Sequence, residues 1–239
     1  MLLVDSYERR ARLTPGLLVV LPIALTAVTL GLRANPVVAA FISLLSVVGG
    51  PFVLASIVRN RGLALQNELF RDWNGPPTRR FLELDNTERP ATQKQAWRHN
   101  VERVTNMTLP TSQEETTDPQ GATGSYDAAV AILRTKTRDK KKFKLVFEEN
   151  RNFGYWRNLR AMRPFGTVVA ILCLLVVIAG AIAAAQTDIL ASTSRTSFVV
   201  GATLDVVVLA FWLFVPTKTA IKRVGESYAE QLLDSTSVL

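Results

Sequence analysis

Four long stretches without charge constrain the fold of this chain more than any other feature. Residues 13–32, 34–58 and 164–187 contain no charged side chain, and residues 196–217 contain only Asp205. A hydrocarbon core of roughly 30 Å needs ~20 apolar residues at a helical rise of 1.5 Å each. A chain in lipid must also satisfy its backbone hydrogen bonds internally, which favours helices. We therefore predict four transmembrane helices; the alternative, helices buried in a soluble core, fits shorter apolar runs better.

Lysine and arginine near the ends of these stretches predict the orientation of the chain, because basic residues favour the cytoplasmic side. One side collects Arg9, Arg10, Arg12, Arg59, Arg61, Arg157, Arg160, Arg163, Lys218, Lys222 and Arg223, whereas the other has only Arg33 and Arg195. We therefore expect a multi-pass membrane protein with both termini and the large domain cytoplasmic. The first apolar run exceeds the roughly 7–15 residues of a signal-peptide core, so we expect a retained signal anchor.

The spans divide the chain into five predicted parts. They are a cytoplasmic N-terminus (1–12), a first transmembrane hairpin (13–58), a cytoplasmic domain (59–163), a second transmembrane hairpin (164–217) and a cytoplasmic C-terminal tail (218–239). The predicted fold class is an all-α membrane protein with four transmembrane helices in two hairpins. A mostly helical cytoplasmic domain is inserted between helices 2 and 3.

Within the cytoplasmic domain, apolar residues recur at helical spacing. This spacing predicts helices over 60–72 and 92–107, and a third from 126 to about 137 after a flexible loop at 119–124. Thr111 and Glu114 have the spacing of a capping box, in which each residue satisfies a backbone N–H of the other. In the C-terminal tail, Tyr228, Leu232 and Leu233 are spaced for packing.

Gly49, Gly50 and Pro51 interrupt the second predicted span. Proline removes a backbone hydrogen bond and glycine lowers helix preference, so we expect a helix kink here. The kink is either a hinge that moves in function or a static bend filled by a neighbouring helix.

Asp205 is the most informative single residue, because it lies near the middle of the fourth span. A carboxylate there costs about 2.5–3.5 kcal/mol on insertion scales, and such residues usually face the bundle interior or a water-filled cavity. Asp205 could form hydrogen bonds with the hydroxyl groups of Thr26, Thr29, Ser43 and Ser46, and such bonds would suit a protonated carboxyl group. Two interpretations stay open: a pore-lining, proton-linked or gating group, or an interhelical hydrogen bond that fixes packing.

A basic and aromatic segment precedes the third span. Its residues are Lys140, Lys141, Lys142, Lys144, Tyr155, Trp156, Arg157 and Arg160. Residues 59–163 hold 20 Lys and Arg against 13 Asp and Glu. We interpret the segment as a lipid-facing anchor on a bilayer with anionic headgroups, since each basic residue there contributes roughly 1 kcal/mol. Capture of a nucleotide or nucleic acid is the competing interpretation, which the position of the segment disfavours.

The inventory of reactive side chains argues against an enzyme. There is one histidine, His99, and one cysteine, Cys173. Neither a phosphate-binding glycine loop nor a nucleophile or zinc-protease motif occurs in the sequence. Adjacent carboxylates such as those of Glu114 and Glu115 point about 100° apart on a helix, so they do not form an acid–base pair. We expect no catalytic residue, no metal site and no cofactor.

Several motifs together resemble an uncharacterised family of bacterial membrane proteins, over most of the chain. They are residues 5–15 (DSYERRARLTP), 73–78 (WNGPPT), 109–111 (LPT), 147–150 (FEEN) and 153–159 (FGYWRNL). In that family the last motif tends to read aromatic-Gly-aromatic-Arg-Arg-Asn-Leu, and here Trp156 replaces one arginine. The resemblance implies the membrane topology and a place in the bacterial inner (plasma) membrane, and it implies no activity. In broad layout the chain is also similar to small membrane effectors of bacterial anti-phage systems, a likeness of architecture alone.

Two functional hypotheses follow from different classes of protein. In the first, the chain is a non-enzymatic membrane effector whose cytoplasmic domain receives a signal or binds a partner protein, and whose helices oligomerise and perturb the membrane. In the second, it is a scaffold or receptor that anchors a cytoplasmic partner. A small transporter is a third and weaker option, since the four spans show no internal inversion of the kind many transporters have.

Overall fold

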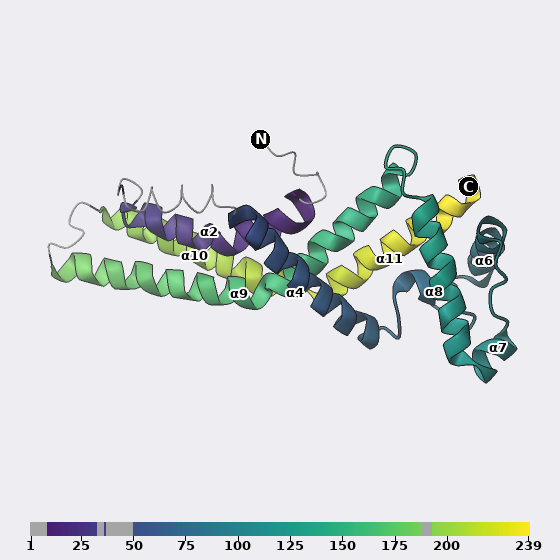
Figure 1. Ribbon diagram of the computed structural model, residues 1–239. Coiled ribbons are helices and arrows are strands. Elements are labelled where there is room, and N and C mark those ends of the chain that lie inside the picture. The colour runs from purple at the N-terminus through teal and green to yellow at the C-terminus, as the bar shows by residue number, and fades with distance from the viewer. Residues whose placement is uncertain (1–8, 33–35, 37–49, 188–192) are drawn as a thin grey trace. The chain divides into compact units, whose positions relative to one another are not determined.

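The computed structural model describes residues 9–32, 36, 50–187 and 193–239 (Figure 1). In these ranges no strand is present and the regular elements are helices. The all-α part of the predicted fold class is therefore confirmed. The chain forms two compact units. We call residues 1–65 with 154–218 the membrane unit, and residues 66–153 with 219–239 the helical domain.

Three described helices are long and apolar enough to cross a membrane, where the sequence predicted four. They are Ala11–Thr29, Lys144–Gln186 and Arg195–Phe214. Most of the missing span lies on residues 37–49, outside the described residues, and only its end is seen at the start of helix α4 (Gly50–Asp72). The predicted kink therefore falls at the edge of the described chain, with Gly49 outside it and Gly50 and Pro51 opening α4.

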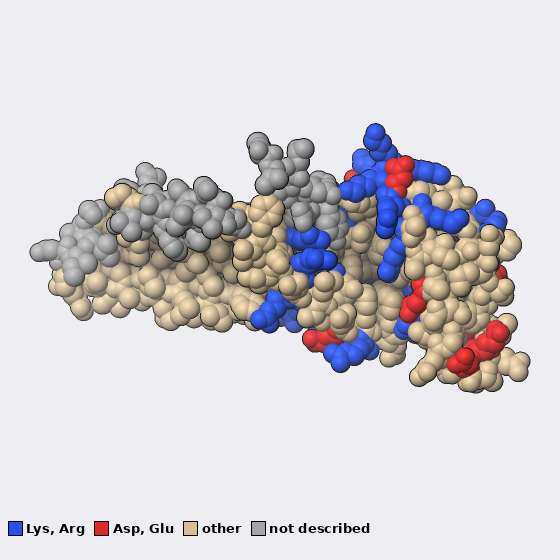
Figure 2. Space-filling model, viewed as in Figure 1, with Lys and Arg blue, Asp and Glu red and all other residues tan. Residues whose placement is uncertain are grey.

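The membrane unit is built from η1 (Arg9–Leu13), α2 (Thr14–Thr29), the first part of α4, most of α9 (Lys144–Gln186) and α10 (Arg195–Phe214). Its buried cluster contains Val19, Val58, Leu159, Met162 and Trp212. The outer side of α9 exposes Val168, Leu172 and Leu175, each 56% accessible. No charged side chain is visible over this part of α9 (Figure 2). Such a surface suits hydrocarbon rather than water.

Glycines let the helices of this unit approach closely. A Cβ atom at Gly16 would lie 2.6 Å from Cγ of Leu54, and one at Gly166 would overlap the ring of Trp212. Trp212 is itself fully buried. Small residues at helix contacts allow such backbone approach in membrane bundles, where packing rather than the hydrophobic effect holds helices together.

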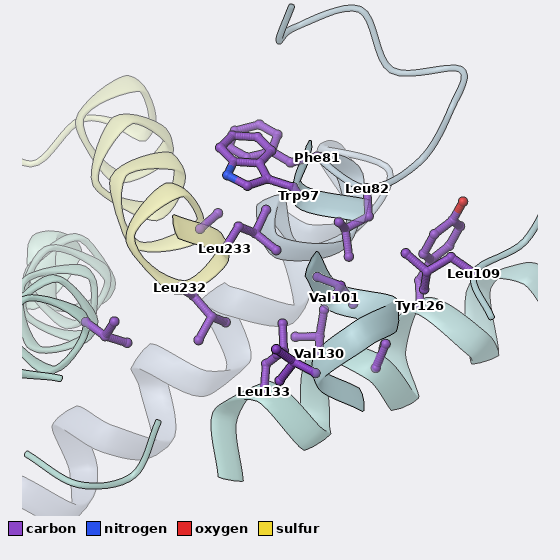
Figure 3. Close-up of a cluster of buried hydrophobic side chains, with 14 of the residues drawn as sticks. Phe81, Leu82, Trp97, Val101, Leu109, Tyr126, Val130, Leu133, Leu232 and Leu233 are labelled. Carbon is purple, nitrogen blue, oxygen red and sulfur yellow. The ribbon is translucent and has the colours of Figure 1, made fainter. Parts of the chain in front are cut away.

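The helical domain consists of the later part of α4, α5 (Pro77–Arg80), α6 (Ala91–Thr105), α7 (Ser112–Thr117), α8 (Pro119–Lys136), the start of α9, α11 (Lys218–Asp234) and η3 (Ser235–Val238). One hydrophobic cluster holds it together (Figure 3). Phe81 and Trp97 stack in this cluster with ring centroids 5.9 Å apart. Val101 of α6 and Leu133 of α8 are fully buried.

Helix boundaries in the domain follow local chemistry. The capping box is confirmed: Glu114 N–H donates to the Thr111 hydroxyl (3.3 Å), and Thr111 N–H donates to the Glu114 carboxylate (2.7 Å). The predicted loop at 119–124 is wrong, because these residues are helical in α8. Asp118 caps that helix by accepting from Gly121 N–H (3.0 Å), and Pro119 fits the first helical position, where no N–H is needed.

The C-terminal segment is part of the core of the helical domain. Ala229, Leu232 and Leu233 of α11 are fully buried in the same cluster as Trp97 and Leu133 (Figure 3). The Trp97 indole N–H donates to Asp234 (2.7 Å). Because residues 66–153 and 219–239 share one core, they lie on the same side of any membrane that the chain crosses. The chain between them must then cross an even number of times, and it contains two helices, α9 and α10, that are long and apolar enough to cross.

Candidate functional site in the membrane unit

Asp205 lies on the buried stripe of α10. The helix begins after Ser194, whose hydroxyl accepts from Ser197 N–H (3.1 Å). Phe198, Gly201 and Trp212 share the buried stripe with Asp205, at the spacing of one helix face. Asp205 is 0% exposed. Its position inside the helix packing, rather than on the lipid side, agrees with the rule for charged residues in membrane spans.

Helix α2 supplies the opposite side of the site, and α2 and α10 run side by side (Figure 1). The Thr26 hydroxyl is 3.4 Å from Oδ2 of Asp205, at the long end of hydrogen-bond range. A Cβ atom at Gly201 would overlap the side chain of Thr29, so the glycine allows the two helices to meet here. The Thr29 hydroxyl donates instead to the Leu25 carbonyl (3.0 Å).

The structure therefore brings together two of the four hydroxyl residues considered for Asp205, and only Thr26 bonds to it. Ser43 and Ser46 lie outside the described residues. The other carboxylate oxygen, Oδ1, is buried and has no hydrogen-bond partner within the described chain. Cys173 of α9 is also buried in this unit and is a free thiol.

The energies show that Asp205 is a cost to the described packing. A charged group at the centre of a membrane helix costs about 2.5–3.5 kcal/mol. A hydrogen bond between membrane helices contributes about 0.6 kcal/mol on average. One long bond to Thr26 does not offset the cost, so this carboxyl group has an unmet demand for a polar partner.

Two arginines of α9 bind the C-terminal end of α10. Nη1 of Arg160 donates to the Pro216 carbonyl (2.9 Å), and Nη2 of Arg163 donates to the Leu213 carbonyl (2.8 Å). The last carbonyls of a helix lack partners and carry partial negative charge, so guanidinium groups stabilise them. Arg160 was predicted to face lipid, and its contact is instead with the protein.

Arg157 is also turned inward, against the prediction of a lipid-facing side chain. It is 8% exposed, and its Nε and Nη2 both lie 3.2 Å from Oδ1 of Asn158. Asn158 in turn donates to the Ala11 carbonyl (2.6 Å). Gly62 of α4 packs so closely on Asn158 that a Cβ atom would overlap its amide. This group joins η1, α4 and α9.

The remaining residues of the predicted anchor divide between the two units. Tyr155 and Trp156 pack edge to face, 5.9 Å between ring centroids, beside the buried cluster of the membrane unit. Lys140, Lys141, Lys142 and Lys144 are exposed residues of the helical domain. Basic side chains gather around the start of α9 (Figure 2). Lys140 lies 4.8 Å from the centre of the Phe147 ring.

A polar cavity in the helical domain was not predicted from the sequence. Its volume is about 450 Å³, and Arg79, Arg80, Glu83, Glu115 and Tyr126 contribute to its wall. The Tyr126 hydroxyl donates to Glu115 (2.6 Å) and accepts from Nη1 of Arg98 (2.5 Å). Arg98 does not line the cavity. Burial, and next the Glu115 carboxylate, raise the pKa of Tyr126, so its hydroxyl keeps its proton.

No signal in the sequence marked this cavity, since its residues come from separate helices. His99 is exposed on α6. Among the residues searched, no group of three metal-ligating side chains exists.

Comparisons of the chain with models of protein families, with curated proteins and with solved structures gave no match.

Proposed function

We propose that the protein is a non-enzymatic effector of the bacterial inner membrane. The helical domain receives a signal or binds a protein in the cytoplasm, and the membrane helices then rearrange, oligomerise and perturb the bilayer. Exposed basic residues and the basic span ends favour a cytoplasmic location for both termini and the domain. A role in defence, in which infection supplies the signal, belongs to the same proposal and rests on the architectural similarity given above.

The observation that carries this proposal is the buried Oδ1 of Asp205, which has no hydrogen-bond partner among the residues that the structure describes. A group that costs energy in one arrangement of helices favours another arrangement in which it gains a partner. Water in a pore, a proton or a cation, or a polar group of a second copy would each serve. An intramembrane carboxyl of this kind is by default a functional-site hypothesis.

Continuous helices offer a route from the domain to this site. α9 is 43 residues long, with residues 144–153 in the helical domain and the rest in the membrane unit. α10 carries Asp205 and is followed, after three residues, by α11, whose end lies in the domain core. These covalent connections are the route by which, in this proposal, a change in the domain core acts on α10.

The test is membrane potential in bacteria that express the full chain from a tightly controlled promoter. We expect depolarisation and growth arrest with the wild-type chain and loss of both with Asp205→Leu at equal membrane abundance. Asp205→Asn keeps the shape and removes the charge, so it separates a need for charge from a need for polarity. Thr203→Val is the matched control, since its exposed hydroxyl bonds only its own helix (2.8 Å to Val199 O). Depolarisation by Asp205→Leu at wild-type level would refute the proposal.

The second candidate is a membrane scaffold that anchors a cytoplasmic partner. The polar cavity of the helical domain favours it, because clefts with a few convergent polar groups are common binding sites. In this case expression leaves the membrane potential unchanged. A tagged full chain then retains a partner that Glu83→Lys, in the cavity wall, releases.

A further inference from the structure

A pocket in the membrane unit joins two arginines that are far apart in the sequence. Its volume is about 200 Å³, and its lining includes Arg12 and Leu13 of η1 and Pro51, Phe52, Ala55 and Arg59 of α4. Arg12 is the last charged residue before the uncharged stretch 13–32, and Arg59 is the first after the stretch 34–58. The fold brings two boundaries between charged and uncharged sequence to one place.

The α4 wall of this pocket is polar at one end and apolar at the other. Its residues 51, 52, 55, 56 and 59 fall on one helix face, since positions three and four apart are neighbours. Pro51, Phe52 and Ala55 are apolar, and Ser56 and Arg59 follow. The distance from residue 51 to residue 59 is about 12 Å along the helix axis, at 1.5 Å per residue. Such a gradient matches an amphiphile with an anionic head.

We propose that this pocket binds one anionic glycerophospholipid. The guanidinium groups of Arg12 and Arg59 hold the phosphate, and the Ser56 hydroxyl donates to it. The acyl chains leave over Pro51 and Phe52. Guanidinium matches phosphate oxygens in a bidentate geometry, and basic pockets between membrane helices on the cytoplasmic side are known to bind lipid headgroups.

The size and polarity of the pocket favour a lipid over a free phosphate ion. Pockets for whole drug-sized ligands measure about 300–1,000 Å³, so this smaller pocket fits one headgroup whose tails extend outside it. A free phosphate would use the same arginines but would leave Leu13 and Phe52 uncovered. This site is separate from Asp205, and its occupancy does not depend on the effector proposal.

The test is native mass spectrometry of the full chain in detergent, titrated with phosphatidylglycerol or with zwitterionic phosphatidylcholine. We expect the protein to retain one phosphatidylglycerol molecule in preference to phosphatidylcholine. Arg12→Gln and Arg59→Gln should each weaken its binding about fivefold, and the double substitution about thirtyfold, from about 1 kcal/mol per basic residue and tenfold per 1.4 kcal/mol. The matched control is Arg61→Gln, which removes a charge from the same helix outside the pocket, where the guanidinium lies over Phe165 (5.0 Å).

Further variants separate a shaped pocket from a simple basic surface. Ala55→Trp keeps both arginines and fills the pocket, so we expect it to lose the retained lipid, whereas Arg59→Lys should keep most of it. Circular dichroism checks that each variant is folded. Equal retention of the two lipids, displacement by millimolar inorganic phosphate, unchanged binding in Ala55→Trp, or an equal loss in Arg61→Gln would each overturn the proposal.

Discussion

Leu233→Ala tests whether α11 is a structural part of the helical domain. Leu233 is 0% exposed and lies in the main cluster with Trp97 and Leu133. Truncating a buried leucine to alanine costs about 2–5 kcal/mol, from lost transfer energy and the cavity that remains. Domains of ordinary stability have about 5–15 kcal/mol in total, so this single change removes a large share of it.

Hydrogen exchange measured by mass spectrometry on the full chain in detergent resolves this effect by segment. Core amides that exchange only when the domain unfolds report its free energy of unfolding. A loss of about 2 kcal/mol in this free energy raises their exchange rate about thirtyfold, at tenfold per 1.4 kcal/mol. We expect this acceleration in α6 and α8, which line the same core.

Val238→Ala is the matched control for this experiment. Its side chain is apolar and close in sequence, but it is 66% exposed. We expect exchange in α6 to stay within about threefold of the wild-type rate, since surface changes are usually within ±0.5 kcal/mol. Less than threefold acceleration in Leu233→Ala would show that α11 does not support the core, and would refute the reasoning.

Four further predictions concern other parts of the chain. Gly201→Val should destabilise the membrane unit by about 1–3 kcal/mol through overpacking against α2, measured by thermal unfolding in detergent; Gly124→Ala, in an open part of α8, should instead stabilise that helix by about 0.8–1 kcal/mol. Tyr126→Phe should cost about 1.5–3 kcal/mol in urea unfolding, because it removes the hydrogen bonds of the hydroxyl to the charged groups of Glu115 and Arg98; an unchanged midpoint would contradict this. The hydrogen bond from Lys222 (2.9 Å) lowers the pKa of Glu88 below its ordinary value of 4.5. The ionised Glu88 therefore stabilises the folded domain above pH 4.5, and this contribution is lost as the pH falls through the pKa of the folded state. Glu88→Gln should reduce this loss of stability in acid, and a dependence of stability on pH identical to that of the wild type would argue against the prediction.

Sequence reasoning succeeded where short-range chemistry decides the structure. The absence of charge in 13–32 and 164–187, and the single charged residue in 196–217, are enough to identify helices that can cross a membrane, because lipid accepts few alternatives. The capping box at Thr111 and Glu114 was predictable because both partners lie within one helical turn. The second span was also predicted, but residues 37–49 lie outside the described part of the chain.

It failed where the partner of a residue is distant in the chain. The apolar spacing of Leu232 and Leu233 predicts a packed face, but the spacing does not say that this face completes a core with α6 and α8. Arginines before a span resemble lipid anchors, yet Arg160 binds a carbonyl at Pro216. The start of α8 was misplaced because glycines at 121 and 124 suggested a loop, whereas the Asp118 cap and Pro119 outweigh their low helix preference.

The site at Asp205 was half predictable. A carboxylate is costly inside a membrane span, so the sequence alone singled out this residue. The sequence also offered Thr26 as one of several possible hydroxyl partners. The choice of Thr26 as the partner of Oδ2 depends on the rotation of α2 against α10, which Gly201 permits, and so does the lack of a partner for Oδ1 among the described residues.

The place of α11 in the core has a consequence for biosynthesis. Residues 219–239 leave the ribosome after α9 and α10, yet they supply Ala229, Leu232 and Leu233 to the centre of the helical domain. The apolar surface of residues 66–153 therefore stays uncovered while the rest of α9 and α10 are synthesised. Completion of α9 and α10 is therefore a condition for a folded domain, and a chain that stalls before α11 presents an open core to proteases and chaperones.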